Sequence, residues 1–314
     1  MKNDIRLTKE IESLILGMGA DLVGVAPLDR FEGNTPPGWG PTDYMKEATC
    51  VISLAIHQAD GVCDTWGDYS EPGKSISPYL FYGYGLINLE MGRIANAAAK
   101  RLEYKGFKSL TFPPTWTISF YRWFGLREGP LRGDFSHRHA AVAAGLGEFG
   151  WNGLTMTPTF GSRARFNSII TNAPLVPSPM YDGPPICQPE RCKKLCTKVC
   201  PTQAFTDDIL KVKVGDRVFE YPRNDVVRCQ YGTGGLVKGS GSIMGIEIPP
   251  GPGDPRHLVE CMAKQRGPDK VMHDTSFGII CGAFCGQCLH QCPAHIYQRT
   301  GVGAKESKKA VASR

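Results

Sequence analysis

Eight of the twelve cysteines of this chain lie in two short strings, and each string ends in proline. The two strings are Cys187-x4-Cys192-x3-Cys196-x3-Cys200-Pro201 and Cys281-x3-Cys285-x2-Cys288-x3-Cys292-Pro293. Short spacings of this kind let several thiolates of one turn converge on one metal centre. A fourth thiolate followed by proline points away from that turn, and in two-cluster ferredoxins it binds the other cluster. The spacing therefore predicts two [4Fe-4S] clusters with crossed ligation.

Crossed ligation divides the cysteines into two sets. We expect the first cluster to be bound by Cys187, Cys192, Cys196 and Cys292. The second cluster then receives Cys200, Cys285 and Cys288, and it needs one more ligand. The remaining candidates for that place are Cys229, Cys261 and Cys281.

Disulfides and zinc are the alternatives to clusters. Residues 1–21 contain no apolar signal-peptide core, so we expect a reducing, cytoplasmic compartment in which disulfides are rare. Zinc also takes four thiolates, but zinc sites favour paired C-x2-C knuckles, and the first string has none. The gaps of the first string are also wider than the common ferredoxin spacing. Clusters are therefore favoured over zinc without excluding it.

Length and composition indicate a two-domain globular protein. The chain has 314 residues, of which 41% are hydrophobic and 21% charged, and no stretch approaches the ~20 apolar residues of a membrane span. We expect a first domain over 1–180 and a second over 181–300, with an insertion at about 206–280. Part of the net charge of +6 lies in a basic tail at 301–314, which we interpret as solvated rather than as a nucleic-acid site.

The first domain alternates helical and strand patterns. Helix is predicted over 7–18, strands over 21–26 and 50–56, a long helix with an apolar stripe over 87–102, and a strand within 107–112. This order predicts a mixed α/β core. Cys50 begins a strand and is expected in the core. A β-hairpin is predicted over 210–221, turning at Gly215-Asp216.

Three glycines, Gly145, Gly147 and Gly150, match the dinucleotide-binding pattern G-x-G-x-x-G. We reject that interpretation, because an alanine-rich helical run precedes the glycines where a strand is required. The acidic residue expected ~20 positions later is also missing. These glycines are instead expected to end the helix and to allow a close approach of the backbone.

Two pairs of polar residues flank this glycine block. His137 and His139 face different sides of a helix, so we expect them to start the helix or to form hydrogen bonds rather than to bind metal. Arg163 and Arg165 lie in an apolar stretch without acidic neighbours in sequence. They are either surface residues or part of a pocket for an anion or a developing negative charge.

With these residues assembled, the chain resembles the corrinoid iron–sulfur reductases, which include reductive dehalogenases and epoxyqueuosine reductases. The resemblance extends from about Asp21 to Pro293. It is carried by Tyr82-Gly-Tyr-Gly-Leu-Ile-Asn88, Ala144-Gly-Leu-Gly-Glu-Phe-Gly150, Thr157-Pro-Thr-Phe-Gly-Ser-Arg-Ala-Arg165, Ile170-Thr-Asn-Ala-Pro-Leu175 and the two Cys-Pro strings.

The resemblance implies a nitroreductase-like α/β domain that holds a base-off corrinoid (cobalamin), followed by a ferredoxin-like domain with two [4Fe-4S] clusters. Members of the family supply an extra cluster ligand from an Asp-x-x-Arg/Lys-Cys turn, and Asp225-Val-Val-Arg-Cys229 fits that turn. Cys229 is therefore our choice for the second cluster. The residues implied as corrinoid contacts are Gly145, Gly147, Gly150, Asn152, Phe160 and Arg163.

The resemblance also implies catalytic residues. Dehalogenases of the family use a tyrosine acid beside an Arg or Lys, for which Tyr121 and Arg165 are the candidates. The epoxyqueuosine enzymes use an aspartate ahead of the Gly-Leu-Gly block, for which Asp134 is the candidate, although it lies closer to that block.

Three functions follow as hypotheses. The first is reductive dehalogenation of a small organohalide, with electrons from a low-potential ferredoxin or flavodoxin. The second is epoxyqueuosine reduction on tRNA, against which the short chain after Pro293 counts. The third is an electron-transfer or corrinoid-activating protein without substrate chemistry.

Overall fold

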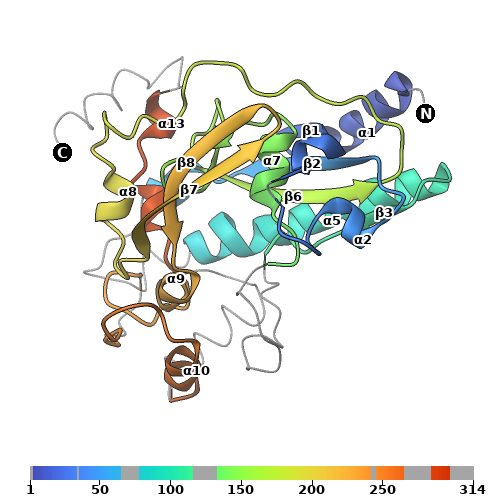
Figure 1. Ribbon diagram of the computed structural model, residues 1–314. Helices are drawn as coiled ribbons and strands as arrows, with labels where there is room; N and C mark the ends of the chain where they lie inside the picture. Colours follow the sequence, from blue (N-terminus) through green and yellow to red (C-terminus); the bar gives the residue numbers. More distant parts are fainter. Residues whose placement is uncertain are drawn as a thin grey trace.

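A computed structural model describes residues 3–33, 35–64, 78–115, 133–241, 245–264 and 284–297 (Figure 1). Tyr121, Cys281 and the basic tail at 301–314 lie outside the described residues.

The centre of the molecule is a four-stranded antiparallel sheet with the strand order β1-β2-β6-β3. Its strands are β1 (Leu22–Pro27), β2 (Cys50–His57), β3 (Ser109–Thr111) and β6 (Ala164–Thr171). The expected mixed α/β class is confirmed. β2 and β6 are buried along nearly their whole length because both faces of the sheet are covered.

One face of the sheet is covered by α1 (Ile5–Gly17) and α5 (Leu86–Tyr104). The Asp4 carboxylate caps the start of α1 by accepting from the backbone N–H groups of Arg6 and Leu7. The predicted apolar stripe of the long helix is confirmed, since its members are all buried against the sheet: Ile87, Met91, Ile94, Ala98 and Leu102.

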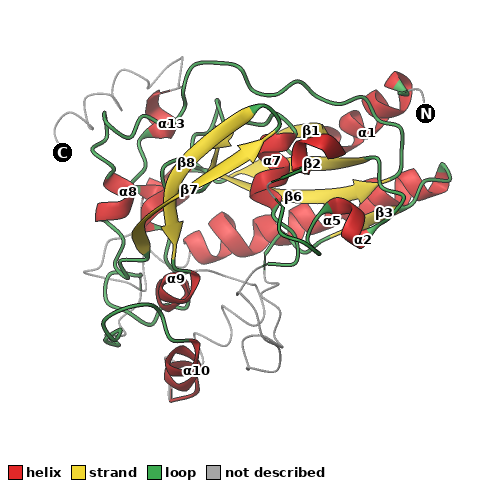
Figure 2. Cartoon of the chain, in the orientation of Figure 1, coloured by secondary structure: helices red, strands yellow, loops and turns green. Residues whose placement is uncertain are grey.

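The other face is covered by α7 (His137–Ala143) and by the hairpin of β7 (Phe205–Val214) and β8 (Arg217–Asn224) (Figure 2). The predicted hairpin is confirmed and is longer than expected. It turns at Gly215, whose φ of 56° suits glycine. Phe219 and Tyr221 of β8 pack against Phe149, so the hairpin shares the core of the sheet.

Short elements complete the described chain. A π-helical turn, η2 (Tyr79–Gly85), leads into α5, and such turns are frequent at functional sites. The other short elements are η1 (Leu28–Phe31), α2 (Pro41–Tyr44), α3 (Asp60–Asp64), β4 (Glu148–Phe149), β5 (Thr155–Met156), α8 (Leu195–Lys198), α9 (Val226–Thr233), α10 (Pro255–Lys264), α12 (Gln287–His290) and α13 (Ala294–Tyr297). No helix among the described residues is long and apolar enough to cross a membrane.

Candidate functional site

The structure brings four cysteine thiols of the two strings together beside α8. We call these four residues the first thiol group. Each pair of its sulfurs lies close enough that two negatively charged thiolates would repel each other. Burial and this repulsion raise the pKa of Cys187 and Cys196 to about 12. The members of the first thiol group are Cys187, Cys192, Cys196 and Cys292.

A second group of four thiols forms beside α9 and α12. Burial and mutual repulsion raise the pKa of Cys229 to about 11 and that of Cys285 to about 12, and the pKa of Cys288 is raised well above its ordinary range. Gly232 of α9 packs closely against Cys285, since a Cβ there would lie 3.4 Å from its sulfur. The members of the second thiol group are Cys200, Cys229, Cys285 and Cys288.

The two thiol groups are neighbours, because the charge of Cys196 in the first acts on Cys288 in the second. Cys261 lies apart from both on α10, with its sulfur 3.6 Å from Nε2 of His257. Within the described residues, no three Cys, His, Asp or Glu side chains converge closely enough to hold a single metal ion. A four-iron cluster needs a wider set, because its irons and sulfides lie between the thiolates.

Backbone N–H groups are directed at the sulfurs of both groups. Trp151 N donates to Cys187 Sγ at 3.2 Å, and Ala204 N donates to Cys200 Sγ at 3.4 Å. Burial raises the pKa of Cys292, and the backbone N–H of Ala294 opposes that rise. Such hydrogen bonds stabilise thiolate charge, which is what a metal-bound sulfur requires.

The glycines of the Gly-Leu-Gly-Glu-Phe-Gly block fit against the chain itself. Gly145 ends α7 with a φ of 78°, as expected, and a Cβ there would lie 1.9 Å from the carbonyl oxygen of Pro179. A Cβ on Gly147 would lie 1.8 Å from the carbonyl oxygen of Met156. A Cβ on Gly150 would strike the side chain of Met156. The expected close approach of the backbone at these three glycines is therefore confirmed. The atoms that pack against them belong to Pro179 and Met156 of this same chain.

Asn152 and Phe160, two of the implied corrinoid contacts, are engaged within the protein. Asn152 is buried, and its amide donates to the carbonyl of Cys288 at 3.0 Å, which ties the loop between β4 and β5 to the second string. Phe160 stacks on His57 at 4.4 Å between ring centroids.

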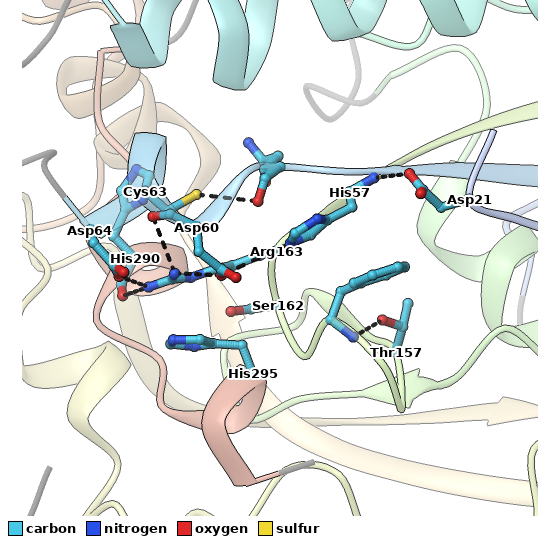
Figure 3. A network of polar contacts seen from close by, with 12 residues as sticks. Asp21, His57, Asp60, Cys63, Asp64, Thr157, Ser162, Arg163, His290 and His295 are labelled. Carbon is cyan, nitrogen blue, oxygen red and sulfur yellow. Dashed lines mark hydrogen bonds and ion pairs between the residues drawn. The ribbon is translucent and has the colours of Figure 1, made fainter. Parts of the chain in front are cut away.

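Arg163 is 1% exposed and lies at the junction of α3, β6 and α12 (Figure 3). Its guanidinium bonds to the carboxylates of Asp60 at 2.7 Å and Asp64 at 2.6 Å, and to the carbonyl of His290 at 3.3 Å. The expectation of a surface arginine or an anion pocket at this position is corrected, because the two carboxylates already neutralise the cation. α3 supplied the acidic partners that were missing from the neighbouring sequence.

Arg165 lies in β6, two residues after Arg163, and its side chain has different neighbours. Its Nε donates to the side-chain oxygen of Asn88 at 2.8 Å, and its guanidinium lies 3.7 Å above the centre of the Tyr84 ring. The Tyr84 hydroxyl is 3.1 Å from that of Thr115. Arg165 is only half-buried, and among the described contacts its guanidinium meets no carboxylate, so its positive charge remains available.

Tyr79 connects Arg165 to the second thiol group. It is buried, its ring is T-shaped against Tyr84 and against His290, and both Arg165 and Cys285 act on its hydroxyl. Burial raises its pKa well above the ordinary range, so it stays protonated. Tyr79 therefore lies between Arg165 and Cys285 of the second thiol group.

Asp134 and the histidines occupy the segment ahead of the glycine block. The backbone carbonyl of Asp134 accepts from the Tyr44 hydroxyl. His137 bonds through Nδ1 to Ser168 and through Nε2 to the carbonyl of Pro113, both at 2.9 Å. His139 Nδ1 lies 2.6 Å from the hydroxyl of Ser136, which caps α7. The expected hydrogen-bonding role of both histidines is confirmed.

Three site residues escaped sequence reasoning, namely Asp60, Asp64 and Tyr84. The two aspartates carried a weak signal, since their spacing of four places them on one face of a helix. Tyr84 belongs to the segment from Tyr82 to Asn88, which carries the resemblance to the corrinoid iron–sulfur reductases but predicts no role for this tyrosine.

The fold and the site together are a mixed α/β domain with two groups of four cysteine thiols beside it. Two curated relatives of this chain are tetrachloroethene reductive dehalogenases. The chain is 27% identical over 221 residues to the tetrachloroethene reductive dehalogenase of Sulfurospirillum multivorans, covering 69% of this chain and 42% of the relative. It is 29% identical over 217 residues to that of Desulfitobacterium hafniense, covering 61% and 37%. The resemblance to the corrinoid iron–sulfur reductases is thereby confirmed.

The fold is also similar to that of a solved structure. The catabolic reductive dehalogenase NpRdhA matches 88% of this chain and 34% of its own, with a TM-score of 0.51 and 17% identity, which shows the fold alone. An epoxyqueuosine reductase with a tRNA stem loop matches 96% of this chain and 84% of its own, at a TM-score of 0.47 and 14% identity. No family model matches the chain. The chain spans less than half the length of the curated relatives it matches.

Proposed function

We propose that the two thiol groups hold two [4Fe-4S] clusters, and that the protein relays electrons through them to a reductive dehalogenation. The observation that carries the proposal is the assembly of eight cysteines into two sets of four, with Cys229 as the fourth member of the second. The buried thiols and the N–H groups directed at them fit metal-bound thiolates.

A corrinoid is part of this proposal because the relatives are reductive dehalogenases. When bound, it supplies the low-valent cobalt that attacks carbon–halogen bonds. Of the contacts implied for it, Arg163 is paired with Asp60 and Asp64, Asn152 is bonded to Cys288, and the glycines meet the protein itself. These residues do not present free groups to a corrinoid, and we derive no step through it.

Arg165 is the residue of this chain that we assign to the substrate. Reduction of an organohalide takes up two electrons and one proton, breaks the carbon–halogen bond, forms a carbon–hydrogen bond and releases halide. A half-buried guanidinium without a described carboxylate partner favours the developing negative charge of the halide. Its stacking on Tyr84 fixes the guanidinium plane. Tyr121 and Asp134 remain the proposed proton donors.

Anaerobic purification followed by absorption and EPR spectra, with iron and cobalt analysis, tests this function. We expect about eight irons per chain, stoichiometric cobalt after reconstitution, and halide release from aryl or alkyl halides with a low-potential donor. Arg165→Gln is expected to lower halide release about 10²–10³-fold with unchanged iron. Arg93→Gln, on the exposed side of α5, is the matched control.

The outcomes separate the rival functions. Two clusters with cobalt but no halide release would favour epoxyqueuosine reduction if a tRNA stem loop were turned over. Clusters without any turnover would favour an electron carrier. Zinc in place of iron would contradict the proposal.

A further inference from the structure

We infer that the surface around the first thiol group is the docking site for a small acidic one-electron carrier protein. This inference rests on the proposed cluster function and adds to it the place where electrons enter. Four cations lie within eight residues of one another in the ligand loop: Arg191, Lys193, Lys194 and Lys198. We call these four residues and Trp151 the basic collar.

The basic collar reaches directly to a cluster thiol. Lys194 Nζ lies 4.4 Å above the ring of Trp151, and the backbone N–H of Trp151 donates to Cys187 Sγ at 3.2 Å. Trp151 is half-buried. A rigid aromatic ring beside exposed cations is the composition that protein interfaces favour.

The backbone of the ligand loop holds the lysines in this place. Among the residues that the structure describes, three non-glycine residues have positive φ, and two of them are Lys193 at 52° and Lys194 at 54°. Consecutive side chains in this conformation are disfavoured, and such strain collects at functional sites. The left-handed pair turns the chain between Cys192 and Cys196 and leaves Lys193 exposed beside the thiols.

Within the part of the chain that the structure describes, Lys193 and Lys198 of the basic collar form no ion pair. Glu190, the one acid in the ligand loop, lies 3.5 Å from Lys194, and its side chain is 89% exposed. Lys193 and Lys198 are exposed. A net positive rim of this kind attracts an acidic partner and speeds its encounter.

The position of the first thiol group suits electron entry. Cys196 connects it to Cys288 of the second group, and Tyr79 connects the second group to Arg165. An electron that enters at the basic collar therefore reaches the first cluster before the second, and the second before the substrate side. Each transfer oxidises the carrier by one electron and reduces the first cluster by one, without bond changes.

The test uses full-length, anaerobically purified protein and a reduced acidic ferredoxin as the probe. The second-order rate constant for bleaching of the cluster absorption is measured against ionic strength, and ferredoxin affinity is measured by calorimetry. The double variant Lys193→Glu/Lys198→Glu is expected to lose at least about tenfold in rate constant and affinity at low salt, and its salt dependence should flatten. Photoreduction by the small carrier 5-deazariboflavin should be unchanged.

Lys46→Glu/Lys100→Glu is the matched control. Both lysines are exposed, and Lys46 follows α2, at the other end of the molecule from α8 (Figure 1). Equal losses in both double variants, or no loss in either, would overturn the docking site. A missing cluster spectrum would count against the proposed function instead. The calorimetric affinity for ferredoxin would still show whether the basic collar is the docking site.

Discussion

The guanidinium of Arg163 lies 2.7 Å from the carboxylate of Asp60, although 103 residues separate them along the chain. This ion pair joins the end of the central sheet to α3. The same arginine bonds to the carbonyl of His290, between two ligands of the second string. Ser162 beside it bonds to the carbonyl of Leu289 at 3.0 Å. The segment around Arg163 therefore fastens the sheet to the cysteine-bearing segment.

Replacement of Arg163 should destabilise the protein strongly. Arg163→Met removes the guanidinium that pairs with Asp60, whose side chain is only 22% exposed. The expected loss is toward the lower end of about 3–5 kcal/mol, because Asp64 can regain water. Chemical denaturation measures it. Arg223→Met, which breaks a 2.6 Å pair between half-exposed side chains, should cost about 0–1 kcal/mol. Equal losses of stability in the two variants would contradict the role of Arg163 in holding the sheet to the cysteine-bearing segment.

Gly161 should not tolerate a side chain. Its φ is 56°, and a Cβ would lie 2.3 Å from the backbone nitrogen of His295, three residues after Cys292. Gly161→Ala is expected to cost about 1–2 kcal/mol of backbone strain and about 1–3 kcal/mol of overpacking. Iron content should fall as well, because Cys292 is displaced. Gly106→Ala has a φ of 89° but open space, so it should show the strain alone and keep its iron.

Iron analysis of cysteine variants should identify the last ligand of the second cluster. Cys229→Ala is expected to lower the iron content from about eight to about four atoms per chain, since one [4Fe-4S] cluster loses a ligand. Cys261→Ala should leave it unchanged, because that sulfur lies beside His257 rather than among the other thiols. The assignment fails if Cys261→Ala or Cys281→Ala halves the iron while Cys229→Ala does not.

Stability should fall between pH 6.5 and about 4 partly because of His137. Burial lowers its pKa to about 4, and the charge of Arg165 adds to this, so the unfolded chain takes up a proton in that window before the folded protein does. The contribution of neutral His137 to the free energy of unfolding is complete above pH 6.5. It is lost as the pH falls, by up to about 1.4 kcal/mol per pH unit. Denaturant titrations at several pH values measure the slope.

His137→Gln is the comparison for this prediction. Glutamine can still donate to the Pro113 carbonyl and accept from Ser168, as neutral histidine does. The variant should therefore keep most of its stability at neutral pH and show a shallower decline toward pH 4. An unchanged decline would assign the pH dependence to other groups.

Local pattern determined most of the secondary structure. The stripe of Ile87, Met91 and Ile94 repeats at helical spacing, and the run from Cys50 to Ile56 is apolar except for Ser53, so each segment carries its own signal. Cysteine spacing likewise indicated which sulfurs belong together, because ligands within one turn are near in sequence. The docking of β8 on Phe149 carried no such signal, since it depends on packing between distant segments.

The sequence by itself indicated a metal–thiolate chemistry, since cysteine strings followed by proline are recognisable from residue type and spacing alone. Only the tertiary structure decided how the charges are used. It paired Arg163 with two aspartates and left Arg165 stacked on Tyr84, although the two arginines are only two residues apart in the sequence. The physical reason is that Coulomb energy depends on distance in space, and α3 and η2 bring their side chains to β6 only when the chain is folded.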